Sequence, residues 1–232
     1  MELQMPEGAV LSVVTGSRAY GLDGEESDVD RRGVFVVPTP MFWRLDKPPT
    51  HVDGPMPEQF SWEIERFCVL AMRANPTVLE CLWSPIVEHT TPVGEELLAI
   101  RRAFLSRAAE RTFAAYSDDQ FRRLESRGPQ GPDARFAGEL RFRKMAMHLL
   151  RLLAGGLHLV RHGEPLVRVD DRLRERLLAV RHGETGWQEA RRWRAELTGE
   201  LAAATEEGSA LPEEPDKEVI EDFLARVRRS AL

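Results

Sequence analysis

The stretch at residues 15–30, TGSRAYGLDGEESDVD, decides how the N-terminal part of this chain folds. The apolar run 10–14 before it predicts a short buried strand, and Gly16 with Ser17 breaks that strand. The chain then reads as a second strand over 27–37, because the later part of this segment is GVFVV and a proline follows it. The two aspartates of the stretch therefore stand at the solvent-facing start of a strand that becomes apolar.

Asp28 and Asp30 are two residues apart, so on a strand their side chains point to the same face. Their Cα atoms are then expected to lie about 6.5–7 Å apart. Two carboxylates at that spacing repel each other unless a cation lies between them. Oxygen ligands select a hard ion such as Mg²⁺. Val29 points to the opposite face, which suits a core position, so the pair predicts a metal site.

Gly16 and Ser17 supply the complementary half of such a site. Glycine lets a ligand approach the backbone closely, and the serine offers a hydroxyl and a backbone N–H at the start of a turn. A phosphate bound there would share the metal with the two aspartates. Arg18 is a further phosphate ligand candidate, whereas Tyr20 is expected to pack. The phosphate loop of ATPases, GxxxxGK[ST], is not present.

The combined pattern, an apolar residue and Gly-Ser followed by SDxD, resembles the DNA polymerase β-type nucleotidyltransferase superfamily. The resemblance implies that Gly16 and Ser17 bind a nucleoside triphosphate. It also implies that Asp28 and Asp30 bind two divalent ions, Mg²⁺ or Mn²⁺.

Four segments narrow this resemblance to the RlaP-like nucleotidyltransferases that are associated with RNA repair ligases. They are GSRAYGLDGEESDVDRRGVFVVP, LAMRANPTVLECLWSP, KMAMHLLRLL and VRHGE, and together the resemblance covers nearly the whole chain. It implies nucleotide transfer as the activity, in a family that is associated with RNA repair. We therefore expect transfer of an NMP from an NTP to a hydroxyl acceptor, either RNA or another molecule, with release of pyrophosphate.

Two-metal phosphoryl chemistry usually needs a third carboxylate, which binds a metal or takes the proton of the attacking hydroxyl. In the superfamily this acid lies on a later, adjacent strand. Glu63 is the first choice, because it follows an expected third strand over 60–62, and Asp53 and Glu65 are alternatives. The other reading of Glu63 is an acid in the first turn of a helix, where the helix dipole favours it.

A second group of candidates is the basic stripe Lys144, His148 and Arg151. The spacing i, i+4, i+7 places these side chains on one face of a helix. Such a stripe beside a triphosphate would neutralise the charge that develops on the leaving pyrophosphate. The alternative is a solvated basic face, and the resemblance favours the functional reading because the family shows a similar stripe.

The chain changes character near residue 92, which predicts two domains. The order before this point mixes strands and helices, and the rest reads as helical. We therefore expect an α+β protein, with a small mixed-sheet nucleotidyltransferase domain at 1–92 and an all-helical region at 93–232. Helices are expected over 95–107, 110–126, 137–154, 170–181, 187–205 and 216–229, with a break at Gly155-Gly156.

The composition is that of an ordinary soluble protein, with 42% apolar and 30% charged residues among 232 and a net charge of −6. No apolar run is long enough to span a membrane, and the N-terminus is not expected to be a signal peptide. Cys68 and Cys81 lie in apolar surroundings and predict buried free thiols in a cytoplasmic protein. Residues 101–161 hold thirteen Lys and Arg against six Asp and Glu, so a polyanionic acceptor is reasonable.

The string LHLVRHGEP at 157–165 resembles the opening of histidine phosphatases, in which a strand delivers the Arg-His-Gly. That fold would require α/β units and another catalytic histidine after the motif. The remainder here reads as helical, and the later histidine, His182, lies in a second RHGE. Both copies therefore predict helix C-termini that are capped by glycine.

A second functional hypothesis is a nucleotide-binding or RNA-binding partner of a repair or toxin–antitoxin system with little catalytic turnover. A poorly placed third carboxylate would favour this hypothesis over the enzyme.

Overall fold

The computed structural model describes residues 3–25, 27–127 and 136–232 of the chain. Internal contacts divide it into two compact units. The sheet unit comprises Met1–Ser106 and Glu213–Leu232, and the helical unit comprises Arg107–Pro212. The predicted boundary at residue 92 differs from this division, because the segment after it and the C-terminal helix both pack with the strands' unit.

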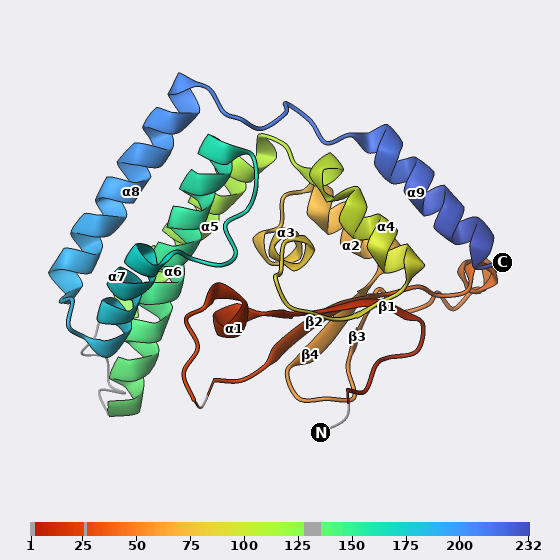
Figure 1. Cartoon of the computed structure of the whole chain (residues 1–232), viewed down its shortest axis with the longest axis horizontal. Coiled ribbons are helices and arrows are strands. Elements are labelled where there is room, and N and C mark those ends of the chain that lie inside the picture. Colours follow the sequence, from red (N-terminus) through yellow and green to blue (C-terminus); the bar gives the residue numbers. More distant parts are fainter. Residues whose placement is uncertain (1–2, 26, 128–135) are drawn as a thin grey trace. The chain divides into compact units, whose positions relative to one another are not determined.

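The sheet unit contains a mixed sheet of five strands in the order β3-β4-β2-β1-β5. Strands β1 to β4 are labelled in Figure 1. Strands β1 and β2 pair antiparallel, β2 and β4 pair parallel, and the outer pairs β1–β5 and β3–β4 are antiparallel. The inner strand β1 is buried from its second residue to its end because its mostly apolar side chains are covered on both faces. The strands are β1 (Ala9–Thr15), β2 (Asp30–Phe35), β3 (His51–Asp53), β4 (Gln59–Glu63) and β5 (Val87–Thr90).

The expected strands were found, with two differences. Strand β2 begins at Asp30 rather than at residue 27. The short outer strands β3 and β5 were not expected, because their sequences HVD and VEHT carry polar side chains that are mostly exposed or half-buried. They form because each pairs with a stronger inner strand.

Short helices complete the sheet unit. They are α1 (Gly16–Tyr20), α2 (Ile64–Met72), α3 (Pro76–Leu82), α4 (Pro92–Ala99) and α9 (Lys217–Ser230), together with the 3₁₀-helices η1 (Thr39–Trp43) and η2 (Arg101–Phe104). Helix α3 begins as expected from Asn75-Pro76, since the Asn75 side chain accepts a hydrogen bond from the Val78 N–H at 3.2 Å.

The C-terminal helix α9 belongs to the sheet unit although it is remote in sequence. Its apolar stripe of Ile220, Phe223 and Val227 is buried, and α9 contacts α2, α4 and η2. Arg228 of α9 forms an ion pair with Glu63 at the end of β4, with 2.8 Å between Nη1 and Oε1. The Arg228 carbonyl also accepts a hydrogen bond from the Thr39 hydroxyl at 2.6 Å. Helix α9 is therefore held by a side-chain ion pair to β4 and by a hydrogen bond from η1 to its backbone.

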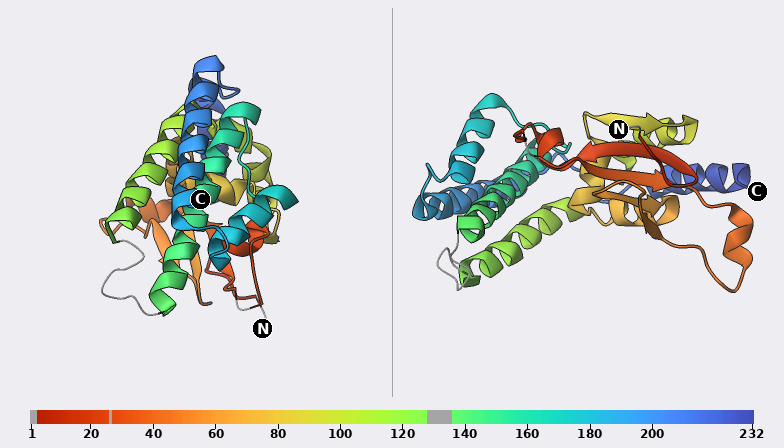
Figure 2. Two further views of the ribbon diagram at one scale, coloured as in Figure 1. Left: turned by 90° about the vertical axis from the view of Figure 1, so that its left-hand side faces the viewer. Right: turned by 90° about the horizontal axis from the view of Figure 1, so that it is seen from below.

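The helical unit is made of α5 (Ala108–Arg127), α6 (Phe136–His162), α7 (Asp171–His182) and α8 (Trp187–Glu207). Helices α5 and α6 lie side by side within it (Figure 2). The expected break at Gly155-Gly156 was wrong, because α6 continues through both glycines to His162. A Cβ on Gly156 would lie 3.0 Å from the Cβ of Phe113, so the glycine serves close helix packing rather than termination.

Both RHGE copies end helices, as expected. Helix α6 ends at His162 and α7 at His182, and the following glycines, Gly163 and Gly183, have φ of +70° and +81°. These are left-handed conformations that glycine adopts without steric cost. Within the part of the chain that the structure describes, no helix is long and apolar enough to cross a membrane.

Cys68 and Cys81 are buried free thiols, as predicted. Burial raises the pKa of Cys68 to about 12, and burial likewise raises the pKa of Cys81 far above its ordinary value. Since the thiolate is the reactive form, we expect neither cysteine to react with dithiobis(nitrobenzoate) at pH 8 in the folded protein. Both should react after unfolding in urea, and fast labelling of the native protein would contradict the buried assignment.

Candidate functional site

The Gly-Ser turn and Asp30 meet at one end of the β1–β2 pair. Thr15, the last residue of β1, is paired with Asp30, the first residue of β2. Gly16 follows with φ of +67°, and a Cβ built on it would lie 2.1 Å from Oδ2 of Asp30. A residue with a side chain would therefore displace this carboxylate. The two halves of the predicted site, 14 residues apart in sequence, are in direct contact.

This contact predicts a clear effect of adding one methyl group. Gly16→Ala both clashes with Asp30 and forces alanine into the left-handed region, which alone costs about 1–2 kcal/mol. Gly24→Ala is the matched control, because a Cβ on Gly24 meets no atom within 4 Å. Urea unfolding followed by circular dichroism should show a lower midpoint for Gly16→Ala and an unchanged one for Gly24→Ala. Equal midpoints for the two variants would contradict the described contact.

Arg18 links the turn to the loop that carries the first aspartate. Its Nη2 donates to the Ser27 carbonyl at 2.8 Å, and its Nε donates to the Asp28 carbonyl at 3.3 Å. The side chain therefore holds the backbone of this loop against α1. A role in phosphate binding stays a prediction, and the donors that are already engaged limit how the guanidinium can approach a ligand.

Asp28 lies outside β2 and is exposed. The expectation that strand alternation points Asp28 and Asp30 to one face is therefore wrong in its premise, because the strand begins only at Asp30. Val29 is half-buried rather than a core residue. Asp30 itself is partly sheltered, with 32% of its side chain exposed, and its Oδ1 lies 3.9 Å from Nη2 of Arg32.

Glu63 does not join Asp30. In the parallel pair β2–β4 it lies opposite Phe35, five residues further along β2 than Asp30. At about 3.3 Å per residue this is roughly 16 Å, beyond any shared metal. Its carboxylate is 3% exposed, binds Arg228, and accepts the Glu65 N–H at 2.8 Å as the N-terminal cap of α2. The choice of Glu63 as third metal ligand is therefore wrong, and the reading as a helix-start acid is correct.

The two alternatives are also placed elsewhere. Glu65 forms an ion pair with Arg228 at 3.2 Å. Asp53 is exposed and lies on β3, where it pairs with Phe60 of β4, so β4 separates it from β2. Among residues 3–25, 27–127 and 136–232, no group of three or more His, Cys, Asp or Glu side chains is arranged to hold a metal ion. The carboxylate in contact with the Gly-Ser turn is that of Asp30, and Asp28 lies two residues before it in the sequence.

Sequence reasoning missed a buried pair behind the turn. The Tyr20 hydroxyl, at the end of α1, donates to Oε2 of Glu80 in α3 at 2.6 Å. Both residues are buried, with relative exposures of 7% and 5%. Tyr20 packs, as expected. The sequence does hold a signal for this pair, because Glu80 stands among four apolar residues of one short helix. A carboxylate in such a place needs a buried partner.

The basic stripe Lys144, His148 and Arg151 lies on α6, in the helical unit. Lys144 is exposed, His148 is half-buried and Arg151 is 2% exposed. The stripe thus runs from solvent into the core, so a uniformly solvated basic face does not describe it. Its role toward a triphosphate stays a prediction.

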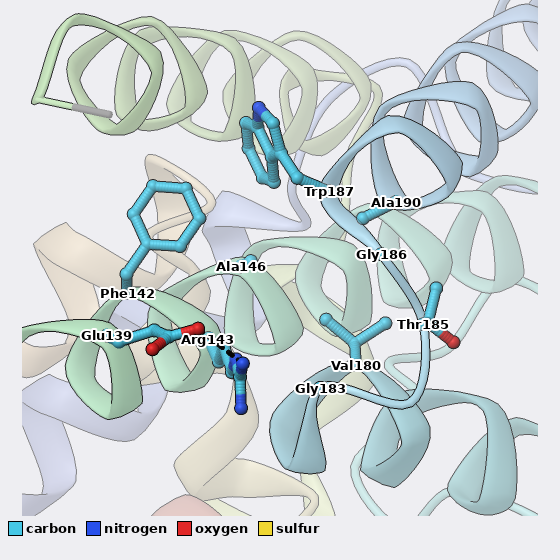
Figure 3. A pocket seen from close by; sticks show the side chains of 10 residues that line it. All are labelled: Glu139, Phe142, Arg143, Ala146, Val180, Gly183, Thr185, Gly186, Trp187 and Ala190. Carbon is cyan, nitrogen blue, oxygen red and sulfur yellow. Dashed lines mark hydrogen bonds and ion pairs between the residues drawn. The ribbon is translucent and has the colours of Figure 1, made fainter. Parts of the chain in front are cut away.

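A cavity of about 110 Å³ lies in the helical unit between α6, the end of α7 and the start of α8 (Figure 3). Its aromatic wall is Phe142 and Trp187, with ring centroids 4.8 Å apart in an edge-to-face arrangement. Its polar side is Arg143, which pairs with Glu139 and donates to the His182 carbonyl at 3.2 Å. None of the predicted site residues lines this cavity.

Comparison with known proteins adds a family. One protein of Bacillus subtilis (strain 168), named uncharacterized protein YcgL, is 28% identical over 96 residues, which is 40% of this chain and 37% of that protein. The chain thus matches well under half the length of this relative. No solved structure matches the chain. The profile of the RlaP family, described as the RNA repair pathway DNA polymerase beta family, matches residues 3–226. The chain therefore belongs to the RNA repair pathway DNA polymerase beta family.

Proposed function

We propose that this protein transfers an NMP from an NTP to a hydroxyl acceptor, with a divalent metal and with release of pyrophosphate. The observation that carries the proposal is the contact between Gly16 and the Asp30 carboxylate, within a chain of a polymerase β-like family. A Gly-Ser turn pressed onto a carboxylate supplies, in one place, backbone and hydroxyl donors for phosphate and an anionic oxygen for a metal.

The residues fit a hard divalent ion such as Mg²⁺ or Mn²⁺. Asp30 is half-buried beside the turn. Asp28 lies two residues before it and is exposed, and its backbone carbonyl accepts a hydrogen bond from Arg18. When bound, the ion would neutralise charge on the phosphates and lower the pKa of an attacking hydroxyl. Asp30 and Asp28 would hold it.

Ser17 and Gly16 would hold the triphosphate. Ser17 is half-buried, and its carbonyl accepts the Leu22 N–H at 2.8 Å, which closes the short helix α1 behind it. The Ser17 hydroxyl would donate to a phosphate oxygen. Because Gly16 has no side chain, the Asp30 carboxylate can lie directly against its backbone.

The acceptor is proposed to be RNA. Residues 101–161 hold thirteen Lys and Arg against six Asp and Glu, and such a surplus of positive charge attracts a polyanion even though the whole chain carries −6. The printed description of the family also refers to RNA repair. Lys144, His148 and Arg151 are proposed as phosphate-binding residues of the helical unit.

A second candidate function is nucleotide or RNA binding with little turnover. It is favoured by the position of Glu63, which is engaged by Arg228 and the Glu65 N–H instead of standing beside Asp30. The same turn and carboxylate would then serve binding alone.

One experiment separates the two candidates. The full chain is incubated with each α-labelled NTP and Mg²⁺, with RNA 3′ ends, small aminoalcohols or protein hydroxyls as acceptors, and NTP binding is measured in parallel. Metal-dependent transfer of label supports the enzyme. Binding without transfer supports the second candidate, and neither binding nor transfer contradicts both.

A further inference from the structure

Helix α1 carries the proposed phosphate turn and is only five residues long, so neighbours must hold it in place. Two of its side chains do so from different sides. Arg18 donates to the backbone of the aspartate loop, at the carbonyls of Ser27 and Asp28. Tyr20 donates to the Glu80 carboxylate of α3. A glycine in the left-handed conformation, Gly21, closes the helix directly after Tyr20.

The bond between Tyr20 and Glu80 is strong for its setting. The distance of 2.6 Å between the hydroxyl and Oε2 is that of an O–H donor bound to a carboxylate, and both side chains are almost fully buried. A low local dielectric strengthens such a bond and makes its loss costly. Glu80 is surrounded in α3 by the buried residues Val78, Leu79, Cys81 and Leu82.

Packing alone does not account for a glutamate at this position. An apolar side chain would fill it without the desolvation cost that a carboxylate carries. What the carboxylate adds is direction, because it fixes the Tyr20 hydroxyl, and hence the last turn of α1, against α3. Ser17 lies three residues before Tyr20 on the same one-turn helix, so a tilt at Tyr20 moves the Ser17 hydroxyl.

We infer that Glu80 is a positioning residue, which acts through Tyr20 to hold Ser17 and Gly16 in place beside Asp30. The inference rests on the proposed function, since it assigns Glu80 a role in triphosphate binding. Loss of the Tyr20–Glu80 bond would leave the Asp30 carboxylate in place but would let Gly16 and Ser17 move. A misplacement of about 1 Å at a reacting group costs up to about 100-fold in rate.

The test compares KM values for the NTP in the full chain. Tyr20→Phe removes the hydroxyl alone and should raise KM about 10-fold, with the same apparent affinity for Mg²⁺. Glu80→Gln keeps an oxygen acceptor, so its KM for the NTP should lie between that of the wild type and that of Glu80→Leu. Destabilisation without a positioning role would lower the amount of active protein, and hence the apparent kcat, but would leave KM unchanged.

Thr39→Val is the matched control. It deletes a hydroxyl whose bond to the Arg228 carbonyl is also 2.6 Å, in the same unit but at the C-terminal helix. We expect it to lower the melting temperature without changing KM. If Tyr20→Phe does not fold, Glu80→Gln takes its place with a smaller expected rise in KM, because it weakens the bond to the tyrosine but retains an acceptor.

A double-mutant cycle shows whether Tyr20 acts through Ser17. If it does, Tyr20→Phe should have little further effect on KM in a Ser17→Ala background. An unchanged KM in Tyr20→Phe, or full additivity with Ser17→Ala, overturns the inference while the proposed function stands. A wild-type protein that neither transfers nor binds nucleotide overturns both.

Discussion

Asp30→Asn is expected to abolish nucleotide transfer, with a loss in kcat/KM of at least about 1,000-fold. The substitution keeps the shape of the side chain that packs on Gly16 but removes the charge that would hold the metal. It also breaks the ion pair with Arg32, which is long at 3.9 Å and partly exposed, so the stability effect should stay within about 1 kcal/mol. Initial rates with saturating Mg²⁺ measure the effect.

The control for this variant is Asp46→Asn, which removes an exposed carboxylate of the same unit far along the chain from the turn. It should retain the wild-type rate, because it changes the net charge equally without touching the site. The rate of Asp28→Asn should lie between those of Asp30→Asn and Asp46→Asn, since Asp28 is exposed and outside β2. A near wild-type rate for Asp30→Asn would remove the metal role from this residue.

Arg228→Met is expected to destabilise the sheet unit by about 3 kcal/mol, the largest stability effect we predict. The substitution leaves the Glu63 carboxylate, which is 3% exposed, without its cation. It also removes the guanidinium that lies 4.3 Å from the Phe42 ring centroid. Hydrogen exchange of peptides from β4 and α2 measures the effect locally, which matters because two compact units need not unfold together.

Glu65→Gln is the matched control, because it removes the other acid that pairs with Arg228. Its side chain is 60% exposed, so we expect a change of no more than about 0.5 kcal/mol. The double variant Glu63→Gln with Arg228→Met should recover part of the loss, since no buried charge is then left unpaired. Equal losses in Arg228→Met and Glu65→Gln would contradict the view that Glu63 is a structural residue.

Local signals predicted the core of the sheet and the Gly-Ser turn. The run over 10–14 and the segment GVFVV are apolar enough to be buried, and glycine marks where the chain turns. The helix ends at His162 and His182 were likewise predictable from the glycine that follows each. These features depend on residues that are neighbours in the sequence.

Features that depend on distant partners were not predictable in this way. Gly156 reads as a helix breaker until Phe113 of another helix is seen to pack on it. Glu63 reads as a metal ligand until the register of β4 and the ion pair with Arg228, 165 residues later, are known. The Tyr20–Glu80 bond spans 60 residues. Strand register and side-chain partners are set by the whole fold.

The two aspartates illustrate both cases. Their proximity to the Gly-Ser turn was expected, and for Asp30 the structure confirms it through the pairing with Thr15. The expectation that both aspartates lie on one strand was wrong, because β2 starts at Asp30, two residues after Asp28. Whether both hold a metal stays a prediction.

The most direct test of nucleotide transfer is a paired labelling experiment on the wild-type chain with RNA as acceptor. One reaction contains NTP labelled at the α-phosphate and the other contains NTP labelled at the γ-phosphate, both with Mg²⁺. We predict that label from the α position enters the RNA, whereas label from the γ position appears in pyrophosphate. Transfer of the γ label to the RNA, or transfer of neither label to the RNA, would contradict nucleotide transfer to RNA.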